Sequence, residues 1–295
     1  MSKSLNNRTM GIVCILISAI CFTGMSTFVR LSGDLPTIQK VFFRNFVAMF
    51  FAFFAIIKTH EKFKIQKGCL KFHILRSLAG LMGVFGNFYA ITKIDLSDAS
   101  MLNKMSPFFA LIFSAIFLKE KVKPKQAFAI AIAFIGAIFI IKPTFSNQNL
   151  FATLAGFVGG MCAGAAYTCV RYMGIKGENG KLIVLFFSTF SCLVTLPYMI
   201  FNFHYMYWWQ WVYLLLAGVC AAGGQFSITA AYTYAPSREI SIYDYSQIIF
   251  AAIIGFIVFG DVPDLWSFVG YVVICAMAIW MYIYNNKTQA LKSAK

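Results

Sequence analysis

Residues Met10–Leu31 read MGIVCILISAICFTGMSTFVRL and contain no charged side chain before Arg30. Residues Phe151–Tyr172, FATLAGFVGGMCAGAAYTCVRY, form a second stretch of the same kind, again uncharged until the arginine near its end. A helix that crosses a lipid bilayer needs about 20 consecutive, mainly apolar residues. The first stretch is also too long for the apolar part of a secretory signal peptide. Both stretches therefore indicate membrane-spanning helices.

The composition of the whole chain agrees with a membrane protein. Hydrophobic residues make up 60% of the 295 residues, aromatic residues 18% and charged residues only 12%. Soluble domains carry roughly 45–50% apolar and about 25% charged residues. Because half of the usual charge is missing, we expect most of the surface of this protein to face lipid.

Further stretches along the chain share this length and apolar character, and the links between them are too short to hold a soluble domain. The ten expected spans are Met10–Leu31, Thr37–Ile57, Phe72–Thr92, Ala99–Leu118, Gln126–Ile141, Phe151–Tyr172, Leu182–Phe201, Trp211–Tyr234, Ile240–Phe259 and Leu265–Tyr284. We therefore expect an all-α integral membrane protein with ten transmembrane helices, whose main partner is the lipid bilayer.

The distribution of basic residues predicts the orientation of these spans. Lysine and arginine collect in cytoplasmic loops, and with a cytoplasmic N-terminus most of the 25 such residues, Arg76 among them, fall on the cytoplasmic side. The exceptions are Arg30, Lys40, Arg44, Lys93, Lys104 and Lys142. The net charge of +15 is thus a topology signal, and nucleic acid is not an expected partner. We expect a multi-pass protein of the bacterial inner (plasma) membrane with both termini in the cytoplasm.

The second half of the chain matches the first half at a shift of 141 residues. With this shift Val29-Arg30 falls on Val170-Arg171, and Gly83 falls on Gly224. Single matches between apolar helices arise easily by chance, but one constant shift through several pairs of spans is a stronger signal. Each repeat holds five spans, an odd number, so the second is expected to be inverted in the membrane. We predict repeats at residues 10–141 and 151–284, an arrangement typical of alternating-access transporters.

The run Asp98–Val122, DASMLNKMSPFFALIFSAIFLKEKV, resembles the fourth-span signature of EamA-type members of the drug/metabolite transporter superfamily. The resemblance lies in the Ser-Pro pair, the helix of small residues and the closing glutamate, Glu120. A weaker copy covers Ser246–Pro263, with Asp261 where the family commonly has glutamate. The resemblance extends from about Gly11 to Tyr284. It implies a ten-helix fold of two EamA repeats and secondary transport, often export, of metabolites.

Polar residues inside apolar spans are costly, and they tend to face a cavity or another helix. On the fourth span Ser100, Asn103 and Pro107 recur at helical spacing, and the shifted positions on the ninth span include Ser241 and Asp244. Two inverted copies of this polar stripe could line one central cavity. The residues that we expect to bind substrate are Asn87, Asn103, Lys104, Tyr167, Gln225, Tyr232, Tyr243, Asp244 and Gln247.

Asp244 is the only carboxylate more than about one turn inside a predicted span, which makes it the candidate for proton coupling or for binding a cationic group. Alternatively, it is a structural partner of Lys104. Lys104 could attract an anionic group of the substrate or extend its ammonium to the membrane surface. Arg44 is expected to tie helix ends together. Three glycines on the sixth span are expected to allow close helix packing: Gly156, Gly160 and Gly164.

Several function classes remain open at this point. No motif of an enzyme or ATPase is present and the eight cysteines are scattered, so we expect no catalytic residue, cofactor or metal site. The leading hypothesis is a secondary transporter, a monomer or homodimer, that moves a small polar solute, best an amino acid or related zwitterion that meets Asp244 and Lys104. A nucleotide-like or vitamin substrate, stacked on tyrosines, is the alternative. A membrane-embedded enzyme and a channel are the alternatives from other classes.

Overall fold

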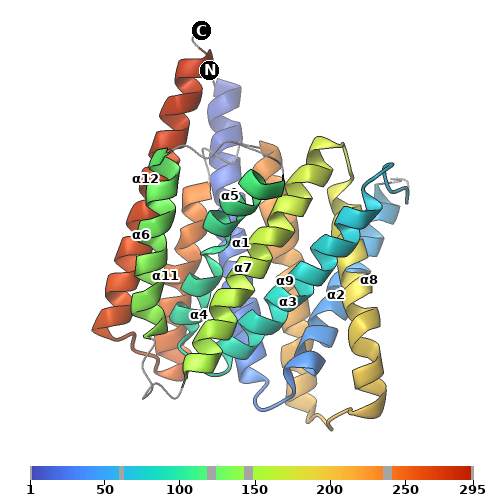
Figure 1. The fold of residues 1–295 in the computed structure, drawn as a ribbon. Coiled ribbons are helices and arrows are strands. Elements are labelled where there is room, and N and C mark those ends of the chain that lie inside the picture. The colour runs from blue at the N-terminus through green and yellow to red at the C-terminus, as the bar shows by residue number, and fades with distance from the viewer. Residues whose placement is uncertain (1, 60–62, 118–123, 143–148, 235–240, 294–295) are drawn as a thin grey trace.

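The computed structural model of the chain describes residues 2–59, 63–117, 124–142, 149–234 and 241–293, and every regular element in these ranges is helical (Figure 1). The elements are α1 (Ser2–Leu31), α2 (Thr37–Lys58), α3 (Leu70–Ile91), α4 (Leu96–Asn103), α5 (Ser106–Phe117), α6 (Pro124–Ile141), α7 (Leu150–Ile175), α8 (Gly180–Phe201), α9 (Trp208–Tyr234), η1 (Ser241–Tyr245), α11 (Ser246–Ile254), η2 (Gly255–Phe259) and α12 (Leu265–Ser293). Within these ranges nine helical segments are long and apolar enough to cross a membrane, and a tenth, Tyr243–Phe259, is shorter. The prediction of an all-α integral membrane protein is confirmed.

The outside of the helix bundle is apolar. Phe54, Phe128 and Leu193 are 62%, 57% and 63% exposed, whereas Gln39 and Lys40 are almost completely buried. A water-soluble protein shows the opposite distribution, because lysine and glutamine normally remain at its surface. Lipid chains cannot form hydrogen bonds, so polar side chains lie inside the bundle and apolar side chains cover its surface.

Both termini lie at one end of the bundle (Figure 1). The opposite end, called the far end below, holds the connections around Asp95, Lys142, Tyr205 and Asp261. Tyr205 and Trp208 are 83% and 78% exposed there. Such rings prefer the boundary between membrane and water, so the far end lies at one membrane surface.

Small residues bring the helices together in pairs. Helix α1 runs along α9, α3 runs along α7, α2 packs on α8 and α6 packs on α12. A Cβ atom added to Gly160 would collide with the carbonyl oxygen of Leu102, and one added to Gly164 would lie 2.8 Å from the carbonyl oxygen of Ser106. Gly156 likewise contacts α3 and α4. The prediction that these three glycines allow close packing is confirmed.

The span expected at Ala99–Leu118 is divided into α4 and α5, with Lys104 and Met105 between them. Pro107 explains the division, because it has no N–H to donate to the carbonyl four residues earlier and its ring crowds that carbonyl. The carbonyl of Lys104 then accepts a hydrogen bond from the Tyr245 hydroxyl, at 3.3 Å. The break in one span is therefore closed by a side chain from another span.

The ninth span is irregular as well. It begins as the 3-10 helix η1, continues as α11 and ends as the π-helix η2, after which Gly260 adopts a left-handed conformation with φ of 72°. The change from η1 to α11 falls at Tyr245 and Ser246, and Tyr245 contacts the break in the fourth span. Two interrupted spans thus meet inside the bundle, a feature typical of substrate sites in transporters.

Candidate functional site

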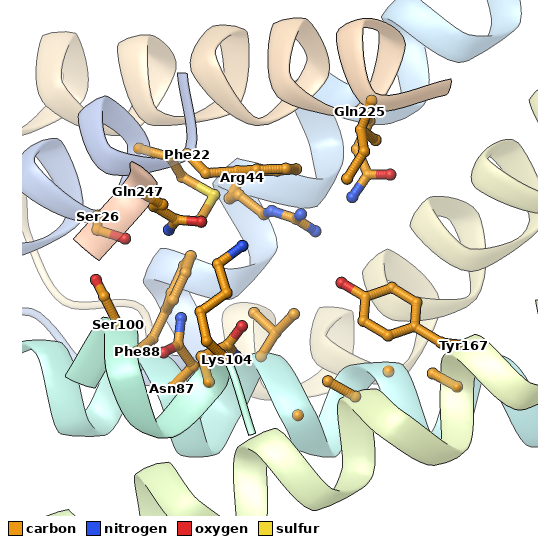
Figure 2. A pocket seen from close by; sticks show the side chains of 18 of the residues that line it. Phe22, Ser26, Arg44, Asn87, Phe88, Ser100, Lys104, Tyr167, Gln225 and Gln247 are labelled. Atoms are coloured by element: carbon orange, nitrogen blue, oxygen red, sulfur yellow. The ribbon is translucent and has the colours of Figure 1, made fainter. Parts of the chain in front are cut away.

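A cavity lies inside the bundle, lined by α1, α2, α3, α4, α7, α8, α9, η1 and α11 (Figure 2). About 900 Å³ of empty space lies between these residues, and this figure includes space that is open to solvent. Seven of the residues predicted to bind substrate line it: Asn87, Asn103, Lys104, Tyr167, Gln225, Asp244 and Gln247. The structure therefore brings together residues from spans that lie far apart in the sequence.

The other two residues predicted to bind substrate are Tyr232 and Tyr243. Tyr243 is not among the lining residues and packs beside Ile15 and Ala231. The side chain of Tyr232 lies outside the described residues. Of the predicted tyrosines whose side chains are described, Tyr167 lines the cavity, and its hydroxyl is directed inward in Figure 2.

Lys104 and Asp244 form an ion pair inside the cavity. The Lys104 Nζ atom lies 2.5 Å from Asp244 Oδ2, and the two side chains are only 9% and 17% exposed. Lys104 comes from the break between α4 and α5, and Asp244 comes from η1, so the pair joins two irregular segments. Asp244 Oδ1 is buried and has no hydrogen-bond partner among the described residues. The pair is therefore incomplete on its carboxylate side.

Two arginines that the sequence analysis did not include in the site also line the cavity, Arg44 from α2 and Arg76 from α3. They are 5% and 9% exposed. Arg76 is thus a buried cavity residue, in contrast to its expected place at the cytoplasmic surface. Arg44 faces the cavity, although it was expected to tie helix ends together. The position of Arg76 inside the expected span Phe72–Thr92 was the sequence signal that could have identified it.

The two guanidinium groups are only partly satisfied. Arg44 donates from Nη1 to Asn45 Oδ1 at 2.7 Å, but its Nε atom is buried without a partner among the described residues. The Nε and Nη1 atoms of Arg76 are in the same situation. Both groups lie over the ring of Phe187, with Cζ 5.8 Å from its centroid for Arg44 and 3.8 Å for Arg76. Aromatic faces attract cations, so Phe187 holds the two groups in place without neutralising them.

The lining of the cavity therefore has an excess of positive charge. Its described residues include Arg44, Arg76 and Lys104, against the single carboxylate of Asp244. Figure 2 shows the Lys104 ammonium and the Arg44 guanidinium directed into the same space. Isolated charges are expensive away from water, so this cavity suits a solute that carries negative groups.

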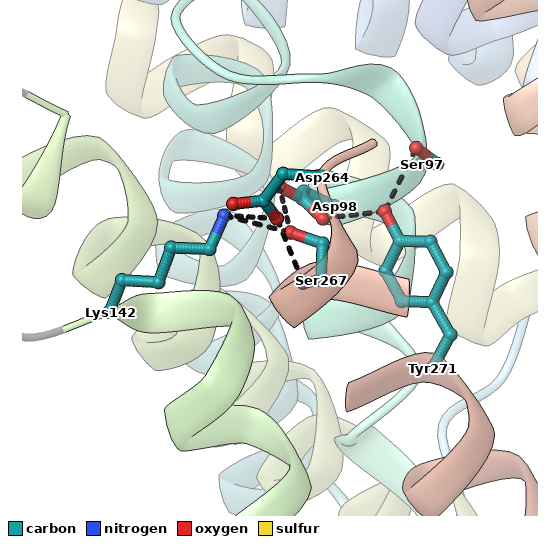
Figure 3. Close-up of polar contacts among 6 residues, drawn as sticks. All are labelled: Ser97, Asp98, Lys142, Asp264, Ser267 and Tyr271. Carbon is teal, nitrogen blue, oxygen red and sulfur yellow. Dashed lines mark hydrogen bonds and ion pairs between the residues drawn. The ribbon is translucent and has the colours of Figure 1, made fainter. Parts of the chain in front are cut away.

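A second polar cluster, called the far-end network, joins the start of α4 to the start of α12 (Figure 3). Asp98 accepts from Tyr271 at 2.5 Å through Oδ1 and from Ser267 at 3.1 Å through Oδ2. Lys142 contacts Asp264 at 2.6 Å and Ser267 at 3.0 Å. The network consists of Ser97, Asp98, Lys142, Asp264, Ser267 and Tyr271. It connects the two halves of the chain at one membrane surface.

A further ion pair lies close to this network. Arg30, near the end of α1, binds both carboxylate oxygens of Asp261, and the backbone N–H of Leu96 donates to Asp261 Oδ2 at 3.0 Å. The Arg30 guanidinium also lies over the Phe259 ring, 4.2 Å from its centroid. Asp261 thus connects α1, α4 and the end of η2, which indicates a structural role at this helix-to-loop junction. Its counterpart Glu120 lies outside the described residues.

Residues 9–142 match the EamA-like transporter family. The pseudopaline exporter CntI of Pseudomonas aeruginosa (strain UCBPP-PA14) is 27% identical over 91% of this chain and 94% of its own length. Human solute carrier family 35 member G1 is 27% identical over 91% of this chain and 77% of its own length. A protein of known crystal structure, 13% identical, superposes with a TM-score of 0.65 over 94% of this chain and 98% of its own, which shows a shared fold.

Proposed function

The chain is an EamA-type transporter of the drug/metabolite transporter superfamily, not an enzyme, and from this premise we propose that it exports a small zwitterionic metabolite, with amino acids and their derivatives as the best-fitting class. The observation that carries the proposal is the Lys104–Asp244 pair, which places one cation and one anion in the same cavity. The amine of a zwitterion would bind Asp244, and its carboxylate would bind Lys104. The name of the bacterial relative, an exporter, supports the direction of transport.

Alternating access requires two halves that can exchange roles, and helix contacts support the proposed inverted repeat. Ser18 in α1 donates to the carbonyl oxygen of Gly224 in α9, at 2.9 Å. A shift of 141 residues relates Ser18 to Gly159 in α7, and it relates Gly83 in α3 to Gly224. These two shifted positions are also in contact, because a Cβ atom on Gly83 would lie 3.1 Å from the carbonyl oxygen of Gly159. The α1–α9 crossing is therefore repeated by the α3–α7 crossing.

A second pair of contacts follows the same rule. Thr23 in α1 contacts the carbonyl oxygen of Gln247 in α11 at 3.4 Å. The same shift relates Thr23 to Gly164 in α7, and it relates Ser106 in α5 to Gln247. A Cβ atom on Gly164 would lie 2.8 Å from the carbonyl oxygen of Ser106. The shift of 141 residues thus relates two independent helix crossings, which supports repeats at residues 10–141 and 151–284 with the cavity between them.

Asp244 would also couple transport to protons. Its free oxygen Oδ1 and its contact with Lys104 allow the carboxylate to exchange between the lysine, a substrate amine and a proton. Protonation would remove the negative charge and release the amine. We place the protein in the bacterial inner membrane with both termini in the cytoplasm, so that proton entry would drive export of the solute.

Purified protein in liposomes would test this function. We expect counterflow of labelled amino acids and their accumulation under a pH gradient. Asp244→Asn should lose the accumulation, because the amide cannot carry a proton, and should weaken exchange, because the substrate amine loses its counter-charge. Asp264→Asn is the matched control, since it removes the carboxylate of another Lys–Asp pair, 2.6 Å long, outside the cavity.

Three other outcomes would decide against parts of the proposal. Counterflow of nucleosides or vitamins, but of no amino acid, would select the alternative substrate class, for which Tyr167 is a stacking surface in the cavity. Accumulation by Asp244→Asn equal to that of the unmodified protein would remove the proton-coupling role. Folded protein that moves no solute in any of these classes would contradict the proposal as a whole.

A further inference from the structure

We propose that Arg44 and Arg76 form an anion subsite that binds a second carboxylate of the transported solute, so that the substrate is an amino dicarboxylate and not a simple amino acid. This inference rests on the proposed function, because it extends the site at Lys104 and Asp244. The two arginines lie in α2 and α3, and both line the same cavity as the ion pair.

The first argument is the unmet bonding capacity of the two side chains. The Nε atoms of Arg44 and Arg76, together with Nη1 of Arg76, are buried without a hydrogen-bond partner among the described residues. Most buried polar side-chain atoms in folded proteins have such a partner. A guanidinium group presents its N–H donors as a rigid fork that matches the two oxygens of a carboxylate. The cavity therefore offers donors at positions where a ligand oxyanion would complete the bonding.

The second argument is the way in which the surroundings preserve this arrangement. Phe187 in α8 supports both guanidinium groups on one ring. Gly80 leaves room beside Arg76, because a Cβ atom there would lie 3.0 Å from Arg76 Nη1 and 3.0 Å from the Phe187 ring. The side chains are thus held in position in advance, which lowers the entropy cost of binding.

The third argument is the charge balance. Lys104 and Asp244 can neutralise each other, which leaves the positive charges of Arg44 and Arg76 without a described counter-charge in the lining. An amino dicarboxylate would place its amine at Asp244, its first carboxylate at Lys104 and its second carboxylate at the arginines. A neutral zwitterion would leave these two largely buried arginines without a counter-charge, so it should bind more weakly.

The primary test uses the unmodified protein and two nearly isosteric probes, L-glutamate and L-glutamine. Competition by each against counterflow, and the thermal shift that each produces in detergent, would be measured. We expect glutamate to bind roughly tenfold or more tightly than glutamine, since one charged hydrogen-bonded contact distinguishes them. Equal affinity for the two probes would overturn the proposal without any need for a variant.

Variants then connect the preference to the two arginines. Arg76→Gln and Arg44→Gln should each reduce the glutamate preference roughly tenfold while leaving glutamine binding nearly unchanged. Arg76→Lys should recover only part of it, because lysine keeps the charge but lacks the fork. Lys93→Gln, which removes an exposed positive charge at the far end, should keep the full preference. A preference that persists in both arginine variants would contradict the assignment.

Two further experiments test whether the arginines bind a carboxylate of the solute or another oxyanion. They also distinguish failure of this inference from failure of the proposed function. Thermal shifts would be measured with inorganic phosphate, and counterflow would be measured in liposomes with and without phosphatidylglycerol. Stabilisation by phosphate alone, or loss of glutamate binding when phosphatidylglycerol is present, would replace the solute carboxylate with another oxyanion. Transport of glutamine without any preference for glutamate would overturn this inference and leave the proposed function intact, whereas no transport of any solute would overturn both.

Discussion

The far-end network and the central cavity both bury charged side chains, but they differ in how those charges are satisfied. At the far end, Asp98 accepts a hydrogen bond at each carboxylate oxygen, and Asp261 does the same with Arg30 and the backbone of Leu96. In the cavity, one oxygen of Asp244 lacks a partner among the described residues. Asp98, Asp261 and Asp244 are therefore all largely buried carboxylates, but the hydrogen bonding of the first two is complete, whereas that of Asp244 is not.

This difference separates structural charges from functional charges. A buried charge with all its partners stabilises one arrangement of helices, and removing one partner exposes the full cost of burying the other. A buried charge without partners reduces stability and remains useful only if a ligand or a proton completes it. Removing a fully bonded charge at the far end should therefore lower stability, whereas removing an unpaired arginine charge in the cavity should raise it.

The largest effect on stability is expected at Asp261. Asp261→Asn should lower the free energy of unfolding by about 3 kcal/mol, because Arg30, whose side chain is only 23% exposed, loses its counter-charge. Equilibrium unfolding in mixed micelles would measure this loss. Asp264→Asn provides the control, since that carboxylate is 49% exposed. A loss at Asp261 no larger than in the control would mean that the far end does not hold the helices together as described.

The next effect concerns the ion pair in the cavity. Lys104→Met and Asp244→Asn should each abolish coupled transport, and a double-mutant cycle on unfolding should give a coupling energy of about 2 kcal/mol, because the two atoms are 2.5 Å apart and largely buried. Transport and unfolding would be measured on the same preparations. A coupling energy near zero would indicate that the two charges do not interact in the folded protein, and it would remove the basis for an exchange between lysine and substrate.

Much of the fold follows from the sequence because the bilayer imposes a simple rule on each helix. Stretches such as Met10–Leu31 must be apolar over about 20 residues, and this local property can be read without knowledge of any neighbour. Most of the expected limits agree with the helices to within a few residues, but α1 begins earlier, at Ser2, and α12 continues further, to Ser293. The division of the fourth span was missed, although Pro107 was visible, because a proline alone does not indicate whether a helix bends or breaks.

The residues of the cavity were harder to predict from the sequence than the spans. Lys104 and Asp244, 140 residues apart, could be connected because the predicted repeat matched the polar stripes of the fourth and ninth spans, and a structural pair of these two residues was one of the alternatives. Arg76 was missed because a basic residue near the start of a span normally reaches the membrane surface. Its position in the cavity depends on Phe187 and Gly80, which belong to two different helices. The sequence places Arg76 inside an expected span, but it does not show which helices surround it there.

A smaller effect, of opposite sign to that at Asp261, is expected at the cavity arginines. Arg76→Gln should raise the free energy of unfolding by about 1 kcal/mol, because it removes a buried charge whose donors lack partners. Transport of the preferred substrate should fall in the same variant. Thermal unfolding in detergent without substrate would measure the first change and counterflow the second. A clear loss of stability would show that the guanidinium group has a structural role, and the contrast between the two regions would not extend to this residue.

The smallest effect is expected for Lys142 and Asp264, which form the same type of pair as Lys104 and Asp244 but with side chains 31% and 49% exposed. A double-mutant cycle of Lys142→Met and Asp264→Asn should give a coupling energy below about 1 kcal/mol, because water and salt screen exposed pairs. Partial burial acts to raise the pKa of Asp264, but hydrogen bonds from Lys142 and Ser267 and the lysine charge lower it overall. The stabilisation is therefore present above the ordinary aspartate pKa of about 4 and is lost as the pH falls through the lowered value. Repeating the cycle across that pH range, at low and high salt, would test both statements. A coupling energy as large as that of the cavity pair would show that exposure does not distinguish the two pairs, and that the cavity owes its properties to its unpaired arginines alone.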